Sequence, residues 1–135
     1  MISDLHVHTR FSCDCKVTME EYCEEAIRRG VGYICFTDHV DYNRNDEGYL
    51  YYKPQEYFDQ FRQVQDRYSH KLTLLCGMEF AEPHMYPGEL ENLSRLPYDF
   101  ILGSIHFWIN DIFAGNLEAN GIGCEEAFEI GRAHV

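Results

Sequence analysis

The stretch DLHVHTRFS, residues 4–12, begins as a run of β-forming residues and closes on polar side chains. His6 and His8 are two positions apart, so on a strand both side chains point to the same face. Two imidazoles on one face of an otherwise apolar strand are hard to explain as core packing, and shared coordination of a metal ion explains them better. Asp4 lies on the same face, where it would either orient a histidine or cap a backbone group.

The rest of the chain repeats a short apolar run, a loop and an amphipathic helix. Further strands are predicted at 31–37, at 72–76 and from residue 100 to about residue 104, after a first strand at 2–7. These runs are nearly continuous rather than alternating, which is typical of parallel strands that are buried on both faces. Alternation of such strands with helices predicts an α/β fold.

Local signals mark the helices between these strands. Thr18 and Glu21 form a capping box, and Gly30 stands where a helix C-terminus favours glycine. Pro54 suits the first turn of a second helix. That helix carries an apolar stripe of Tyr57, Phe61, Val64 and Tyr68. Short helical segments are also predicted at 87–93 and from 124 to 128.

Each predicted strand ends in ionisable residues. They are His6 and His8, then Asp38 and His39, then Glu79, then His106. In parallel α/β folds the carboxyl ends of the strands meet at one edge, where active sites lie. Asp14 follows the first strand, and its spacing fits a ligand and an exposed loop acid equally well. We interpret His70 as structural, because it falls at a helix end, where a positive charge is favourable.

Composition limits the possible functions. The 135 residues, with 45% hydrophobic and 25% charged, suit one globular domain. A net charge of −12 disfavours nucleic acid as a partner, and it disfavours phosphate-containing substrates unless bound cations reverse the local charge. No apolar run approaches the ~20 residues of a membrane span, and the start does not resemble a signal peptide, so we expect a cytoplasmic protein without a membrane partner. The six cysteines are expected to be reduced.

Four motifs in order, DLHVHTRFS, FTDH, GMEF and GSIHF, resemble the PHP (polymerase and histidinol phosphatase) superfamily, and most closely its histidinol-phosphatase-like phosphoesterases. The resemblance runs to about residue 128. It implies the N-terminal half of a distorted (β/α)7 TIM-like barrel with parallel strands. It also implies a trinuclear centre of divalent metal ions, which are zinc, manganese or iron.

The resemblance also assigns roles to individual residues. His6 and His8 would bind one metal, Glu79 would bridge metals, and His106 would bind a second metal. Asp14 and His39 would bind the third, with Asp14 standing where some members have histidine. Glu79, His106 and His39 are thereby also expected to be the catalytic residues.

The length departs from the family pattern. Such barrels run to roughly 250 residues, and the family's later ligands, a histidine and an Asp-x-His motif, have no counterpart here. We therefore expect residues 1–129 to be a partial PHP domain that is truncated at its C-terminus. Residues 130–135, IGRAHV, can be encoded by a common sequencing-library adapter, and we interpret them as an artefact; the alternative is a genuine helix C-terminus.

These observations favour metal-dependent hydrolysis of a small phosphorylated substrate, with L-histidinol phosphate, and hence histidine biosynthesis, as the best single candidate. Clustered cations would hold the phosphate, and a bound water with its pKa lowered towards ~7 would attack phosphorus. One alternative is another PHP phosphoesterase, or a PHP nuclease or polymerase-associated module. The other is an inactive fragment that only binds metal.

Overall fold

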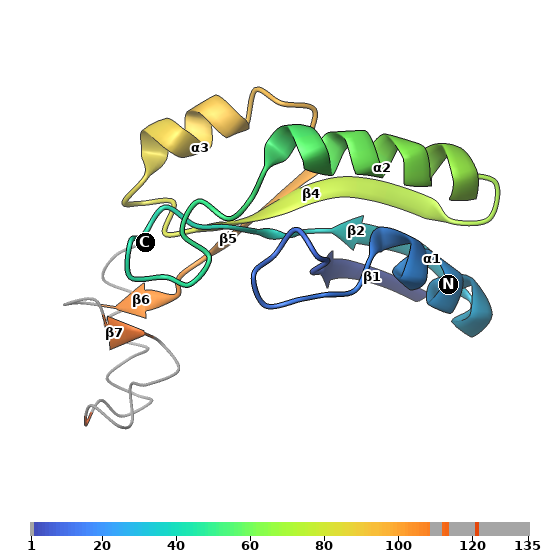
Figure 1. Cartoon of the computed structure of the whole chain (residues 1–135), viewed down its shortest axis with the longest axis horizontal. Coiled ribbons are helices and arrows are strands. Elements are labelled where there is room, and N and C mark those ends of the chain that lie inside the picture. The colour runs from blue at the N-terminus through green and yellow to red at the C-terminus, as the bar shows by residue number, and fades with distance from the viewer. Residues whose placement is uncertain (1, 109–111, 114–120, 122–135) are drawn as a thin grey trace. The chain divides into compact units, whose positions relative to one another are not determined.

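The computed structural model of the chain describes residues 2–108, 112–113 and 121, and it divides into two compact units, Met1–Ser104 and Ile105–Val135. The first unit holds a parallel sheet and three helices within its described residues (Figure 1). Its strands are β1 (Ile2–Val7), β2 (Val31–Phe36), β3 (His39–Val40), β4 (Thr73–Ala81) and β5 (Phe100–Ser104). Its helices are α1 (Met19–Arg29), α2 (Pro54–Tyr68) and α3 (Pro87–Leu93). In the second unit β6 (Phe107–Trp108) pairs antiparallel with β7 (Ile112–Phe113).

All strand pairs in the first unit are parallel, as predicted. Strand β2 lies between β1 and β4, and β5 pairs with the other edge of β4. The two-residue strand β3 pairs with β4 in the register of β2, because Phe36 is opposite Cys76 and His39 is opposite Glu79, at the same offset along the chain. Strands β2 and β3 are therefore one strand with an interruption at residues 37 and 38.

The predicted helix signals are confirmed. The Thr18 side chain accepts a hydrogen bond from the Glu21 backbone N–H, and the Glu21 carboxylate accepts one from the Thr18 N–H, which completes the capping box of α1. Gly30 ends α1 in the left-handed conformation at φ 72°, where a side chain would be strained. Helices α2 and α3 both begin with a proline. The predicted helix at 124–128 lies outside the described residues.

Helices α1 and α2 contribute the apolar side chains that bury one face of β2 and β4. The Phe36 ring lies 6.4 Å from the ring of Tyr22 on α1 and 6.5 Å from the ring of Phe61 on α2. Complete burial of such a large apolar side chain stabilises a fold by about 1.5–3 kcal/mol. Cys35 and Cys76 are buried thiols as predicted, and burial raises the pKa of each to about 12.

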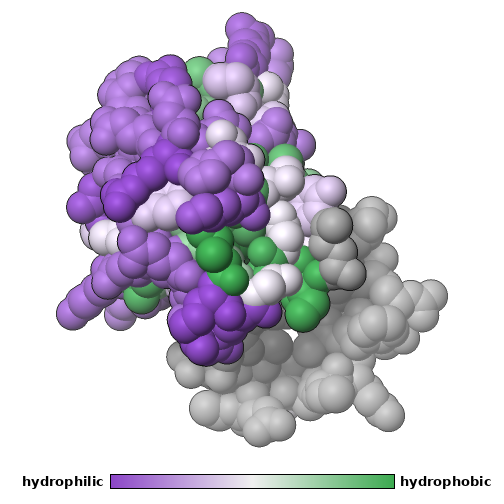
Figure 2. Space-filling view, turned by 90° about the vertical axis from the view of Figure 1, so that its right-hand side faces the viewer, coloured by the Kyte–Doolittle hydropathy of each residue, from purple (hydrophilic) through white to green (hydrophobic). Residues whose placement is uncertain are grey.

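The expectation that every strand is buried on both faces is wrong for the two outer strands. On β1, Ile2 is 61% exposed and Leu5 is 45% exposed, and on β5 Phe100 and Ile101 are also exposed. Each outer strand pairs with one neighbour within the described residues, while β2 and β4 have partners on both edges. Figure 2 shows apolar side chains gathered on a surface that is otherwise mostly hydrophilic.

The third strand is longer than predicted. It was expected at 72–76 with Glu79 beyond its end, but β4 continues to Ala81 and contains Glu79. The added residues pair with β3 on one edge and with β5 on the other. These partners come from distant parts of the chain, so the local pattern did not reveal the extension, nor the short strands β3, β6 and β7.

Two smaller findings concern the cysteines and the helices. Five cysteines fall among the described residues, and all five are free thiols. None of the described helices is both long enough and apolar enough to cross a membrane.

We predict that the 135-residue chain self-associates, because β1 and β5 expose apolar side chains and their outer edges have no partner among the described residues, which favours contact between copies. Sedimentation velocity should detect species larger than 15.9 kDa. Leu5→Lys should shift the distribution towards monomer, while Met85→Lys, at an equally exposed residue outside the sheet, should not. A monomeric wild-type chain at micromolar concentration would contradict this prediction.

Candidate metal centre

Strands β1 and β4 bring two histidines and one carboxylate together. His6 Nε2 lies 3.0 Å from His8 Nε2, and Glu79 Oε2 lies 3.0 Å from the first nitrogen and 2.9 Å from the second. The side chain of Glu79 is only 7% exposed, so its charge is held at the rim of the core. These three side chains can hold one cation between them.

A second group shares His8 with the first. Asp14 Oδ2 lies 3.2 Å from His8 Nδ1 and 3.5 Å from His39 Nε2. The other nitrogen of His39, Nδ1, lies 3.4 Å from Glu79 Oε2. His8 and His39 each therefore place one ring nitrogen towards Glu79 and the other towards Asp14. Five of the six residues expected at the site converge at one edge of the sheet.

The spacing of these atoms fits ligands around a metal ion. Zn–N bonds of about 2.0–2.1 Å in tetrahedral geometry separate ligand atoms by roughly 3.3 Å, and the separations here run from 2.9 to 3.5 Å. Imidazole nitrogens and carboxylate oxygens are also ligands that zinc, manganese and iron accept. The donor set of this edge thus fits one or more divalent cations.

In the absence of metal, the carboxylates around His8 favour its protonated form. The hydrogen bond to Glu79 is the main cause that raises its pKa from 6.5 to about 9; burial lowers the pKa, and Asp14 raises it further. A metal ligand must be a neutral imidazole, so a cation entering this group competes with a proton on His8.

A buried hydrogen-bond network joins the loop after β1 to the segment between β2 and β3. The fully buried Asp38 carboxylate accepts hydrogen bonds from the Thr9 backbone N–H, the Thr9 hydroxyl and the Ser12 hydroxyl. The Ser12 oxygen in turn accepts one from the His39 backbone N–H, at 2.8 Å. Burial raises the pKa of Asp38, and these donors oppose that rise.

This network holds the backbone around three ligand candidates, His8, Asp14 and His39. From the sequence, Asp38 stands out only as a strand-end acid, and no local pattern predicts a role for Thr9 or Ser12. The signal available was that both residues belong to the DLHVHTRFS motif.

The remaining candidates lie elsewhere or have simple roles. His106 belongs to the second unit, so its part in the site stays a prediction. Asp4 accepts a hydrogen bond from the His6 backbone N–H at 3.2 Å, which is the capping role. His70 is an exposed residue in the turn after α2, with Arg67 and Lys71 nearby.

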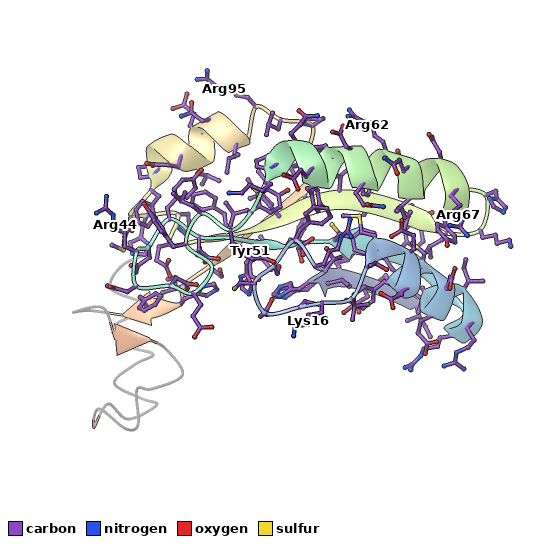
Figure 3. All side chains as sticks on the ribbon, viewed as in Figure 1. Lys16, Arg44, Tyr51, Arg62, Arg67 and Arg95 are labelled. Atoms are coloured by element: carbon purple, nitrogen blue, oxygen red, sulfur yellow. The ribbon has the colours of Figure 1, made fainter. Side chains whose placement is uncertain are left out.

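Two basic side chains on or next to the helices pair with acids of the nearby helix. Arg62 pairs with Asp59, and Arg95 pairs with Glu91. Figure 3 shows Arg62 and Arg95 extending outward from the ribbon. The charges of these two arginines therefore offset acids close to them in the chain.

Comparison with known proteins gives consistent results. Histidinol-phosphatase of Lactococcus lactis subsp. lactis strain IL1403 is 29% identical over 104 residues, which are 76% of this chain and 38% of that protein. A probable histidinol-phosphatase of Clostridium acetobutylicum is 29% identical over 107 residues, 78% of this chain and 40% of that protein. The chain thus spans about two fifths of the length of these relatives.

A solved structure shares the fold. The crystal structure of histidinol phosphate phosphatase from Lactococcus lactis, complexed with Zn, L-histidinol and phosphate, superimposes with a TM-score of 0.75 at 29% identity. The match covers 83% of this chain and 42% of that one. The open parallel sheet described above is therefore the N-terminal part of a TIM-like barrel. The family model named PHP domain matches residues 4–129, and the chain belongs to the PHP domain family.

Proposed function

We propose that the protein is a metal-dependent phosphomonoester hydrolase whose substrate is L-histidinol phosphate. The observation that carries the proposal is the convergence of three imidazoles with two carboxylates at ligand spacing. The similarity to histidinol-phosphatases, one of them solved with Zn, L-histidinol and phosphate, supports the choice of substrate.

Bound divalent cations would supply a nucleophilic water near neutral pH and neutralise the charge of the phosphate. In the proposed centre His6 and His8 would hold one cation with Glu79, and Asp14 and His39 would hold another. Glu79 Oε2 faces both groups, so it is placed to bridge cations. His106 is proposed as a further ligand, as its motif implies.

In this reaction water attacks phosphorus, the ester P–O bond breaks, and an alcohol and inorganic phosphate leave. The chain's residues act by holding the cations in place and by accepting or releasing protons. We propose Glu79, His39 and His106 for this catalytic role. An acidic protein with net charge −12 would otherwise repel a phosphate ester, so activity depends on metal loading.

The experiment that tests the proposal compares this chain with a version extended to the length of its relatives. Both would be loaded with Zn²⁺ or Mn²⁺ and assayed for phosphate release from L-histidinol phosphate, with single-stranded DNA as the alternative substrate. We expect phosphate release by the extended chain, its loss on chelation, and little or no release by the 135-residue chain. Cleavage of DNA instead would indicate the nuclease alternative, and no metal-dependent hydrolysis at all would contradict the proposal.

We predict that His8→Ala lowers metal affinity and the activity of the extended chain by at least about 100-fold, more than the loss of an outer-shell partner causes. His70→Ala is the matched control, because it also removes an imidazole but lies in the exposed turn after α2. Metal affinity is measured by titration calorimetry and folding by circular dichroism. Equal losses from both variants would mean that the effect comes from stability rather than from a metal ligand.

The raised pKa of His8 predicts two opposite trends with pH. As pH rises, the metal-free fold should lose stability, while the affinity for metal should increase. Without metal, the folded pKa of about 9 exceeds the usual 6.5, so the stability from protonated His8 is complete below pH 6.5 and is lost as pH rises through 9. Metal affinity should instead rise with pH, by about tenfold per unit from this proton alone. Calorimetry between pH 6.5 and 8 in buffers of different ionisation enthalpy counts the protons released. Binding without proton release would contradict the prediction.

A further inference from the structure

The interruption between β2 and β3 contains the hydroxyl of a buried tyrosine. Tyr57 lies in the first turns of α2 and is fully buried. Its hydroxyl oxygen lies 2.9 Å from the carbonyl oxygen of Phe36 and 2.9 Å from that of Gly77, and it accepts a hydrogen bond from the Gly77 N–H at 3.2 Å. A side chain on a helix thus contacts the backbone of two neighbouring strands at once.

The hydroxyl lies at the end of the β2–β4 ladder, just before the interruption. Further along the pair, the Glu79 N–H donates to the Asp38 carbonyl. Parallel ladders repeat every two residues, so the preceding bond joins the Gly77 N–H to the Phe36 carbonyl, in agreement with the pairing of Phe36 with Cys76. The Gly77 N–H also donates to the Tyr57 oxygen, which can donate its own proton to the Phe36 carbonyl. The hydroxyl thus adds hydrogen bonds to the backbone of both strands at the point where their ladder is interrupted.

The absence of a side chain at residue 77 belongs to the same arrangement. A Cβ on Gly77 would come within 2.8 Å of Cys35 Sγ and 3.0 Å of the carbonyl oxygens of Phe36 and Phe100. These contacts are too close for any other residue without a shift of backbone. The gap in the ladder therefore accommodates the Tyr57 hydroxyl and no side chain of the strand itself.

We propose that Tyr57 is a positioning residue of the metal centre, because its hydroxyl bonds to the backbone of both β2 and β4 immediately before the ligands. His39 is three residues after Phe36, and Glu79 is two residues after Gly77. The pairing resumes at those ligands, with His39 opposite Glu79. The distance of 3.4 Å between His39 Nδ1 and Glu79 Oε2 thus depends on the two backbone segments that the hydroxyl holds together. This inference rests on the metal centre proposed above.

The chain offers a matched control in Tyr52. This residue is also buried, its ring centroid lies 5.3 Å from that of Tyr57, and its hydroxyl bonds to the Tyr98 hydroxyl at 3.0 Å. Tyr52→Phe therefore removes a buried hydroxyl from the same cluster without touching the backbone of a ligand-bearing strand. If Tyr57→Phe weakened metal binding only by destabilising the fold, Tyr52→Phe should weaken metal binding to a similar extent.

The test titrates the 135-residue chain and both variants with Co²⁺, whose visible absorption reports the number and arrangement of its ligands. We expect Tyr57→Phe to bind Co²⁺ at least about tenfold more weakly, as loss of an outer-shell partner does, and to give a changed spectrum. Tyr52→Phe should retain the wild-type affinity and spectrum at a similar loss of melting temperature. Wild-type affinity and spectrum in Tyr57→Phe would overturn the positioning role. Failure of the wild-type chain to bind Co²⁺ would overturn the proposed metal centre, and the positioning role with it.

A measurement on the wild-type chain covers the case in which Tyr57→Phe does not fold. Coupling between two sites is reciprocal, so a metal ion that orders His39 and Glu79 must also tighten the hydroxyl link. The Tyr57 hydroxyl proton should exchange with solvent more slowly when Zn²⁺ is added, as observed by NMR. A Zn²⁺-saturated chain with an unchanged exchange rate would overturn the inference.

Discussion

The contact of one carboxylate oxygen, Glu79 Oε2, with nitrogens of three imidazoles is the interaction around which the described site is organised. His6, His8 and His39 each place a nitrogen within 3.4 Å of this oxygen. The imidazole lone pairs and the carboxylate charge repel one another unless protons or cations lie among them. The fold tolerates this arrangement because the strands that carry it are held by a core of large buried side chains on their other face.

Parallel pairing of the strands brings together residues that are far apart in the sequence. Glu79 is more than seventy positions from His6 and His8, yet β1, β2 and β4 run in the same direction and end at the same edge. Two further hydrogen-bonding groups connect this edge of the sheet to the interior of the protein. The Asp38 carboxylate holds the loop that lies between His8 and Asp14, and the Tyr57 hydroxyl connects α2 to the gap in the sheet.

The outer strands show how much of a barrel strand's burial comes from neighbours. Strands β1 and β5 have sequences typical of buried parallel strands, but apolar residues such as Leu5 and Ile101 are exposed. The chain spans about two fifths of the length of its relatives, and its fold matches 42% of the histidinol phosphate phosphatase structure. Apolar runs therefore indicated that these segments are strands, while their burial depends on what pairs with them.

From the amino-acid sequence one could predict the three described helices, four parallel strands and most of the residues that meet at the candidate centre. The signals were local, such as the capping box of Thr18 and Glu21, the continuous apolar runs and the ionisable residues at strand ends. The length of β4, the interruption at residues 37 and 38 and the burial of the Asp38 carboxylate became visible only in the folded chain. The tertiary structure also decided that Tyr57, one of four residues in an apolar stripe, places its hydroxyl between two strands. The physical reason is that these features arise from hydrogen bonds between segments far apart in the chain, and no local pattern of residue types encodes which distant backbone group will lie opposite.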